Sequence, residues 1–136
     1  MGVEHKVVPQ NFDEDSIIEE DPAICSKLVV EGKNKSAREL VLNTDQSDEP
    51  ILTADTLVFT PSMKIVGKPI DHNHSRQLLR EFSGTTHSVF STVMLSYKER
   101  SRIETCETLV TFKKMSDEEI EAVSYTHLTL PTKRIV

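Results

Sequence analysis

One stretch of the chain combines a strand-forming pattern with a charged residue near its centre. Residues 51–59 form an apolar run rich in β-branched side chains, which predicts a buried β-strand. Asp55 interrupts this run, and an ionised carboxylate is costly inside a protein unless it is paired or belongs to a site. In the turn that follows, Lys68 lies between Gly67 and Pro69, so a cation projects from a short, stiff loop. A buried carboxylate and such a lysine suit a phosphate group and its metal ion.

The remaining pattern predicts helices and strands around this stretch. Asp21 and Asp71 each precede an expected helix as side-chain caps, and Ser116 begins a capping box. With 136 residues, the chain is long enough for one domain. We expect an α/β domain with a mixed, twisted sheet flanked by helices and a central cleft at the ends of the strand that carries Asp55. The expected elements are strands over 3–9, 51–59, 87–97 and 104–112, and helices over 22–42, over 72–82 and after 116.

Charge and cysteine content limit the partners and the compartment. The net charge of −6 argues against a partner that is a nucleic acid polymer, because phosphate backbones are held by clustered lysine and arginine. No apolar stretch reaches the length needed to cross a membrane. Cys25 and Cys106 lack the spacing of a metal site and are expected to be buried free thiols in a reducing compartment. These features predict a soluble, cytoplasmic protein.

Five short motifs stand out along the chain. The strand contains Ala54-Asp55-Thr56, and the following loop contains Gly67-Lys68-Pro69. The three others are Phe12-Asp13-Glu14, the stretch 82–89 and the stretch 115–120. Together these motifs resemble the Maf family of nucleotide pyrophosphatases, and five motifs in family order are far more specific than any one of them. The resemblance covers roughly residues 2–123 and implies a fold like that of Maf proteins and inosine triphosphatases.

The resemblance implies a reaction and roles for the acidic residues. The reaction is hydrolysis of the α–β phosphoanhydride of a nucleoside triphosphate, ordinary or modified, to a monophosphate and pyrophosphate. Asp55 is expected to act on the attacking water or to hold a divalent metal ion, Mg²⁺ or Mn²⁺, and these two roles stay open. Glu14 is expected to bind the substrate and either to share the metal or to act on Asp55 through the proximity of like charges. Thr56 is expected to contribute to base selection. The family also implies a homodimer.

Lysines are expected to bind the phosphate oxygens. By resemblance these are Lys68 and a lysine in the first helix, for which Lys33 is the nearest equivalent and Lys35 the alternative. On charge alone, both helix lysines are typical of an exposed face, and the acidic residues around Glu14 are typical of a solvated loop.

Both ends of the chain depart from the family pattern. The family's opening Ser-x-Ser-Pro-Arg-Arg loop does not occur in the sequence, and residues 124–136 do not match the family's closing segment. We therefore expect a partial Maf-like domain over 1–123 and a non-native or divergent tail over 124–136. Two alternatives follow. One is a catalytically impaired remnant that still binds nucleotides, and the other is a non-enzymatic acidic interaction domain in which Asp55 is a hydrogen-bonded core residue.

Overall fold

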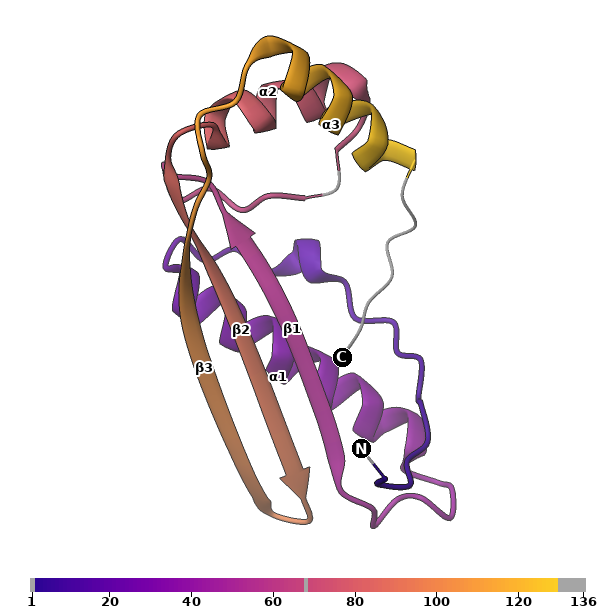
Figure 1. The fold of residues 1–136 in the computed structure, drawn as a ribbon. Helices are drawn as coiled ribbons and strands as arrows, with labels where there is room; N and C mark the ends of the chain where they lie inside the picture. Colours follow the sequence, from indigo (N-terminus) through magenta and orange to yellow (C-terminus); the bar gives the residue numbers. More distant parts are fainter. Residues whose placement is uncertain (1, 68, 130–136) are drawn as a thin grey trace. The chain divides into compact units, whose positions relative to one another are not determined.

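A computed structural model describes residues 2–67 and 69–129, apart from the side chains of residues 15 and 125–129 (Figure 1). The predicted α/β class is confirmed, and so are the positions of the helices. The elements in chain order are a 3-10 helix η1 (Glu14–Ser16), α1 (Pro22–Val41), β1 (Ile51–Phe59), α2 (His72–Phe82), β2 (Thr86–Tyr97), β3 (Arg100–Thr111) and α3 (Asp117–Thr129).

Two details of the prediction change. Residues 3–9 form no strand, because this largely exposed segment has no neighbouring strand with which to pair. The described sheet has the order β1-β2-β3 with neighbouring strands antiparallel, so the parallel pair of a mixed sheet is not found among the described residues. Helix α3 ends at Thr129, residues 130–136 lie outside the described part, and the boundary expected at residue 123 stays a prediction.

Local side-chain chemistry explains where the helices begin. The Asp21 carboxylate accepts hydrogen bonds from the backbone N–H groups of residues 23 and 24, at 3.0 and 3.1 Å. The Asp71 carboxylate accepts one from residue 74 at 2.8 Å. At the start of α3, the Ser116 hydroxyl accepts one from Glu119 at 3.1 Å, as the capping box predicts. Gly84 follows the end of α2 with a φ of 67°, a conformation that glycine adopts at little cost.

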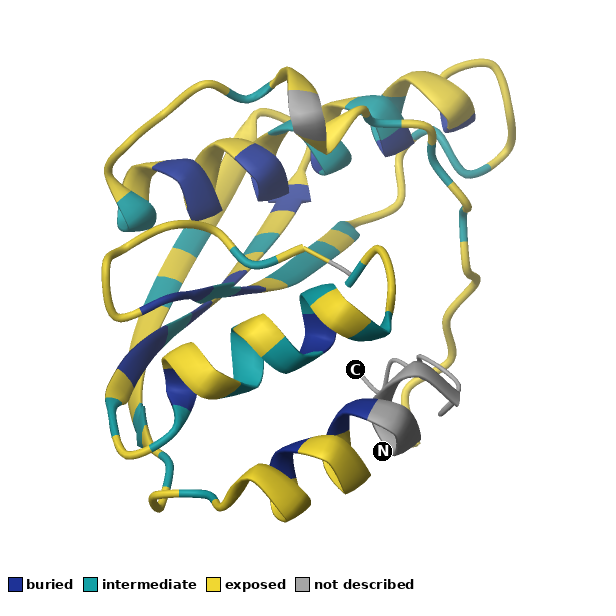
Figure 2. Ribbon diagram, turned by 90° about the horizontal axis from the view of Figure 1, so that it is seen from above, coloured by how far each residue is buried: buried dark blue, intermediate teal, exposed yellow. Residues whose placement is uncertain are grey.

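The chain divides into two compact units, and every strand contributes to both. The first unit contains the chain up to Thr56 and Ser91–Cys106, and the second contains Leu57–Phe90 and the chain from Glu107. In the first unit, α1 covers one face of the sheet, and buried residues recur along one side of the helix (Figure 2). The buried residues of α1 are Cys25, Ser26, Val29, Val30, Asn34, Ala37 and Val41.

The second unit is built around aromatic rings and two neighbouring helices, α2 and α3. The rings of Phe59 and Phe90 meet edge to face at 5.6 Å between centroids. The imidazole of His87 lies 4.4 Å from the Phe82 ring and 5.2 Å from the Phe112 ring. His87 is only 5% exposed, and its buried Nδ1 has no hydrogen-bond partner. This histidine is therefore held by ring packing.

The expectations for membrane-spanning segments and for the two cysteines come from the composition. Within the described residues, no helix is both long enough and apolar enough to cross a membrane. Neither cysteine is in a disulfide, as expected, but only Cys25 is buried. The expectation of burial was wrong for Cys106, which is exposed on β3.

Candidate functional site

Asp55 lies on β1 with its side chain turned toward α1. Because strand side chains alternate between faces, Asp55 shares a face with Thr53, whose hydroxyl bonds to the α1 backbone. The Asp55 side chain is 17% exposed. Its Oδ1 accepts a hydrogen bond from Lys33, whereas its Oδ2 is buried and has no hydrogen-bond partner. One oxygen of the carboxylate is thus buried without a hydrogen-bond partner.

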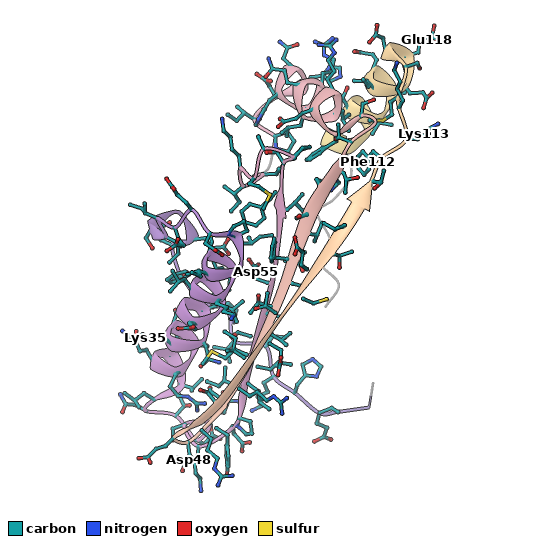
Figure 3. All side chains as sticks on the ribbon, turned by 90° about the vertical axis from the view of Figure 1, so that its left-hand side faces the viewer. Lys35, Asp48, Asp55, Phe112, Lys113 and Glu118 are labelled. Carbon is teal, nitrogen blue, oxygen red and sulfur yellow. The ribbon has the colours of Figure 1, made fainter. Side chains whose placement is uncertain are left out.

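Lys33 is the α1 lysine that reaches Asp55. Its Nζ lies 2.9 Å from Asp55 Oδ1 and 2.9 Å from Glu14 Oε1, and the side chain is 16% exposed. Burial alone lowers the pKa of Lys33, but the hydrogen bonds and charges of Glu14 and Asp55 outweigh this effect and raise the pKa above its usual value. Lys35 is exposed and lies on the side of α1 away from the strands (Figure 3). We call Glu14, Lys33 and Asp55 the Lys33 cluster.

Packing against Gly32 holds the segment that carries Glu14. A Cβ atom at Gly32 would clash with the ring of Phe12, so the ring packs directly on the α1 backbone. Glu14 then begins η1, and its carboxylate, 44% exposed, meets Lys33 from the solvent side. Sequence reasoning missed this role of Phe12. A glycine in the middle of a helix was the signal that could have revealed it.

The Lys33 cluster has the composition of a site for a phosphorylated ligand with a cation. Two carboxylates around one ammonium group leave one negative charge, and the unpartnered Asp55 Oδ2 is an acceptor that a cation could use. Among the described residues, no group of three or more histidine, cysteine, aspartate or glutamate side chains could hold a metal ion. Two carboxylates are nevertheless sufficient for Mg²⁺, which proteins usually bind through one or two carboxylates together with substrate phosphates. The cluster therefore fits a metal ion that arrives with a phosphate.

Two predicted site residues are not brought into the cluster. Thr56 follows Asp55 on β1 and so points to the opposite face of the sheet, where its hydroxyl lies 3.0 Å from that of Ser91. Lys68 lies outside the described residues, and its expected place opposite Asp55 stays a prediction. Of the five residues predicted for the site, the structure thus unites Glu14, Lys33 and Asp55.

The fold and the cluster define an α/β protein with an acidic site bridged by a lysine. The chain belongs to the Maf family, because the sequence model described as "Maf-like protein" matches residues 1–130. A dTTP/UTP pyrophosphatase of Treponema denticola is 35% identical over 130 residues, which cover 90% of this chain and 64% of the relative. One of Neisseria meningitidis is 33% identical over 124 residues, with 90% and 61% covered. The chain therefore spans less than two thirds of the length of these relatives.

Proposed function

We propose that the protein is a nucleoside triphosphate pyrophosphatase that acts on dTTP, UTP or a modified relative of these nucleotides. It hydrolyses the α–β phosphoanhydride and releases a nucleoside monophosphate and pyrophosphate. The observation that carries the proposal is the Lys33 cluster, in which an ammonium group contacts two carboxylates and one buried carboxylate oxygen stays without a partner. The names of the relatives support the choice of base.

Each residue of the cluster has a part in this reaction. Lys33 binds phosphate oxygens and offsets the negative charge that builds up as pyrophosphate leaves. Asp55 orients the attacking water and takes its proton as the water oxygen bonds to the α-phosphorus and the bond to the bridging oxygen breaks. In the alternative arrangement, Asp55 serves as a metal ligand and does not contact the water. In either arrangement, Oδ2, which has no hydrogen-bond partner, would be the oxygen that makes the contact.

Charge pairing supports a divalent cation as part of the substrate complex. When Lys33 turns to the phosphates, Glu14 and Asp55 both lose their ammonium partner. Two neighbouring carboxylates without a counter-charge repel each other. Asp55 and Glu14 would hold Mg²⁺ or Mn²⁺, which would neutralise phosphate charge and lower the pKa of bound water. We therefore propose that the protein binds the triphosphate together with its metal.

Other parts of the proposal rest on family resemblance and composition. They are a contribution of Thr56 to base selection, phosphate binding by Lys68, a homodimer and a cytoplasmic location. Thr56 lies next to Asp55 in sequence but on the other face of β1, so its contribution requires a base that reaches that face.

Pyrophosphate release by variants of the purified chain tests the proposal. Asp55→Asn keeps the size of the side chain but removes its charge, and we expect it to abolish release from dTTP and UTP while the fold is retained. Lys33→Met is expected to lower kcat/KM by about 100-fold or more. Lys35→Met is the matched control, because it removes an exposed lysine from the same helix and should leave the activity unchanged.

The outcomes separate the alternatives. Full activity in Asp55→Asn would remove this carboxylate from the chemistry. Binding of metal and triphosphate without turnover in the unaltered chain would favour the nucleotide-binding remnant. Absence of any heat on titration with triphosphate and Mg²⁺ would favour the acidic interaction domain.

A further inference from the structure

Beside Lys33, α1 is joined to two strands by a chain of hydrogen bonds among buried and half-buried side chains. Arg38 donates to the Ser96 hydroxyl at 3.0 Å, and Ser96 donates to Asn34 Oδ1 at 2.8 Å. Asn34 Nδ2 donates to the Thr53 hydroxyl at 3.4 Å, and Thr53 donates to the Val30 carbonyl at 3.2 Å. We call this set of contacts the Asn34 network. All of its members lie in the first unit.

The chemistry of the end members fixes the direction of the whole network. Arg38 can only donate, so the Ser96 hydroxyl accepts from it and uses its own proton on Asn34 Oδ1. Because Asn34 Oδ1 accepts from Ser96, the Asn34 amide nitrogen faces Thr53 and donates to its hydroxyl. The Asn34 amide nitrogen also reaches the Ile51 carbonyl at 3.4 Å. The Val30 carbonyl accepts the proton of the Thr53 hydroxyl, so every donor in the network has an acceptor. Fully satisfied networks of this kind specify one arrangement of the elements.

The network contacts α1 next to Lys33 and β1 next to Asp55. On α1, Val30 and Asn34 lie on either side of Lys33. On β1, Thr53 lies two residues before Asp55, so both side chains are on the same face. A shift of α1 by a single residue would move Lys33 by about 1.5 Å along the helix axis and would break these contacts. The network therefore sets the register of α1 against β1 at the position of Lys33 and Asp55.

We propose that Asn34 and Ser96 are positioning residues that hold Lys33 in register with Asp55, a role that rests on the proposed phosphate-binding function of Lys33. Lysine is a flexible side chain with a point charge, so its stem must be fixed for the charge to occupy one place. Neither Asn34 nor Ser96 contacts the carboxylates of the cluster in the described contacts. Their effect on the reaction passes through Lys33.

Three single substitutions in the otherwise unaltered chain test the positioning role of Asn34 and Ser96. Asn34→Leu keeps the bulk of the side chain and removes its hydrogen bonds, whereas Ser96→Ala removes only one end of the network. Ser26→Ala is the matched control. Ser26 is also fully buried on α1 and bonds across to β2, with its hydroxyl 2.6 Å from that of Thr92, but it takes no part in the Asn34 network. Loss of a buried hydrogen bond between α1 and the sheet is common to all three.

The first measurement does not require activity. The proton-detected NMR signal of a lysine Nζ survives exchange with water near neutral pH when the ammonium is held in ion pairs. Lys33, assigned by comparison with Lys33→Met, should give such a signal in the unaltered chain and in Ser26→Ala. The signal should be lost in Asn34→Leu and weakened in Ser96→Ala.

The second measurement is kcat/KM for pyrophosphate release. We expect a loss of about 10- to 100-fold in Asn34→Leu and a smaller loss in Ser96→Ala, while Ser26→Ala stays within about twofold. In a Lys33→Met background, Asn34→Leu should have no further effect, because positioning acts through the lysine.

Several results would overturn the role. The first is an unchanged Lys33 Nζ signal in Asn34→Leu. The second is an equal loss of signal or of kcat/KM in Ser26→Ala. The third is a further loss of kcat/KM when Asn34→Leu is added to Lys33→Met. If Asn34→Leu does not fold, the comparison of Ser96→Ala with Ser26→Ala decides. If the unaltered chain releases no pyrophosphate, the proposed function fails, but the Lys33 signal still decides whether the network positions the lysine.

Discussion

Substitution of Gly32 by alanine should stabilise the chain only when the Phe12 ring is absent. Alanine stabilises a helix interior by about 1 kcal/mol relative to glycine, so the change would ordinarily raise the free energy of unfolding. In this chain, the added methyl group would clash with the ring of Phe12, and overpacking of this kind costs about 1–3 kcal/mol. The net expectation for Gly32→Ala is between no change and a loss of about 2 kcal/mol. With Phe12→Ala already present, the same change should stabilise the chain by about 1 kcal/mol.

Urea denaturation of the four proteins in this double-mutant cycle measures the coupling between Gly32 and Phe12. We expect a coupling energy of at least about 1 kcal/mol. Displacement of the Phe12 ring should also move Glu14 away from Lys33 and weaken the Lys33 cluster. If Gly32→Ala stabilised both backgrounds equally, the ring would not pack on this glycine and the explanation of how Glu14 is placed would be wrong.

Two further predictions concern buried titratable groups. Burial lowers the pKa of His87 below its usual 6.5, so the unfolded chain takes up a proton at a pH where the folded chain does not. The free energy of unfolding should therefore fall as the pH decreases from about 7.5 to about 5.5, and His87→Leu should flatten this dependence in urea titrations. Burial, followed by the charges of Glu19 and Asp55, raises the pKa of Cys25. A thiol reagent should label the exposed Cys106 rapidly in the native protein and Cys25 only after unfolding, and equal rates would contradict this description.

The elements of the fold could be predicted because their signals are local. The capping residues Asp21, Asp71 and Ser116 each act within a few residues of their own position. The choice between Lys33 and Lys35 required the structure, because the apolar pattern of the helix fits either residue. In the structure, Lys33 continues the helical repeat of buried residues, whereas Lys35 falls on the opposite side of α1.

The missed features depend on contacts between residues far apart in sequence. Phe12 packs on Gly32, which lies 20 positions away in the chain, and the sequence around either residue does not identify the other as its partner. Ser96 joins Asn34 and Arg38 from a strand more than 50 residues away. The exposed start of the chain was predicted as a strand from a half-apolar pattern, but a strand needs a neighbouring strand, which a pattern does not reveal.

The proposed function explains the position of Asp55 better than stability does. A carboxylate kept only for the fold would be expected to have both oxygens satisfied, and a buried acceptor without a partner costs about 1–3 kcal/mol. Asp55→Asn would remove one charge from a cluster that carries two carboxylates and one ammonium group, leaving Lys33 balanced by Glu14 alone. The free energy of unfolding should therefore stay the same or rise in this variant even as the proposed activity disappears, which is the trade-off expected if Asp55 is retained for chemistry. A large loss of stability would instead show that Asp55 holds the fold together.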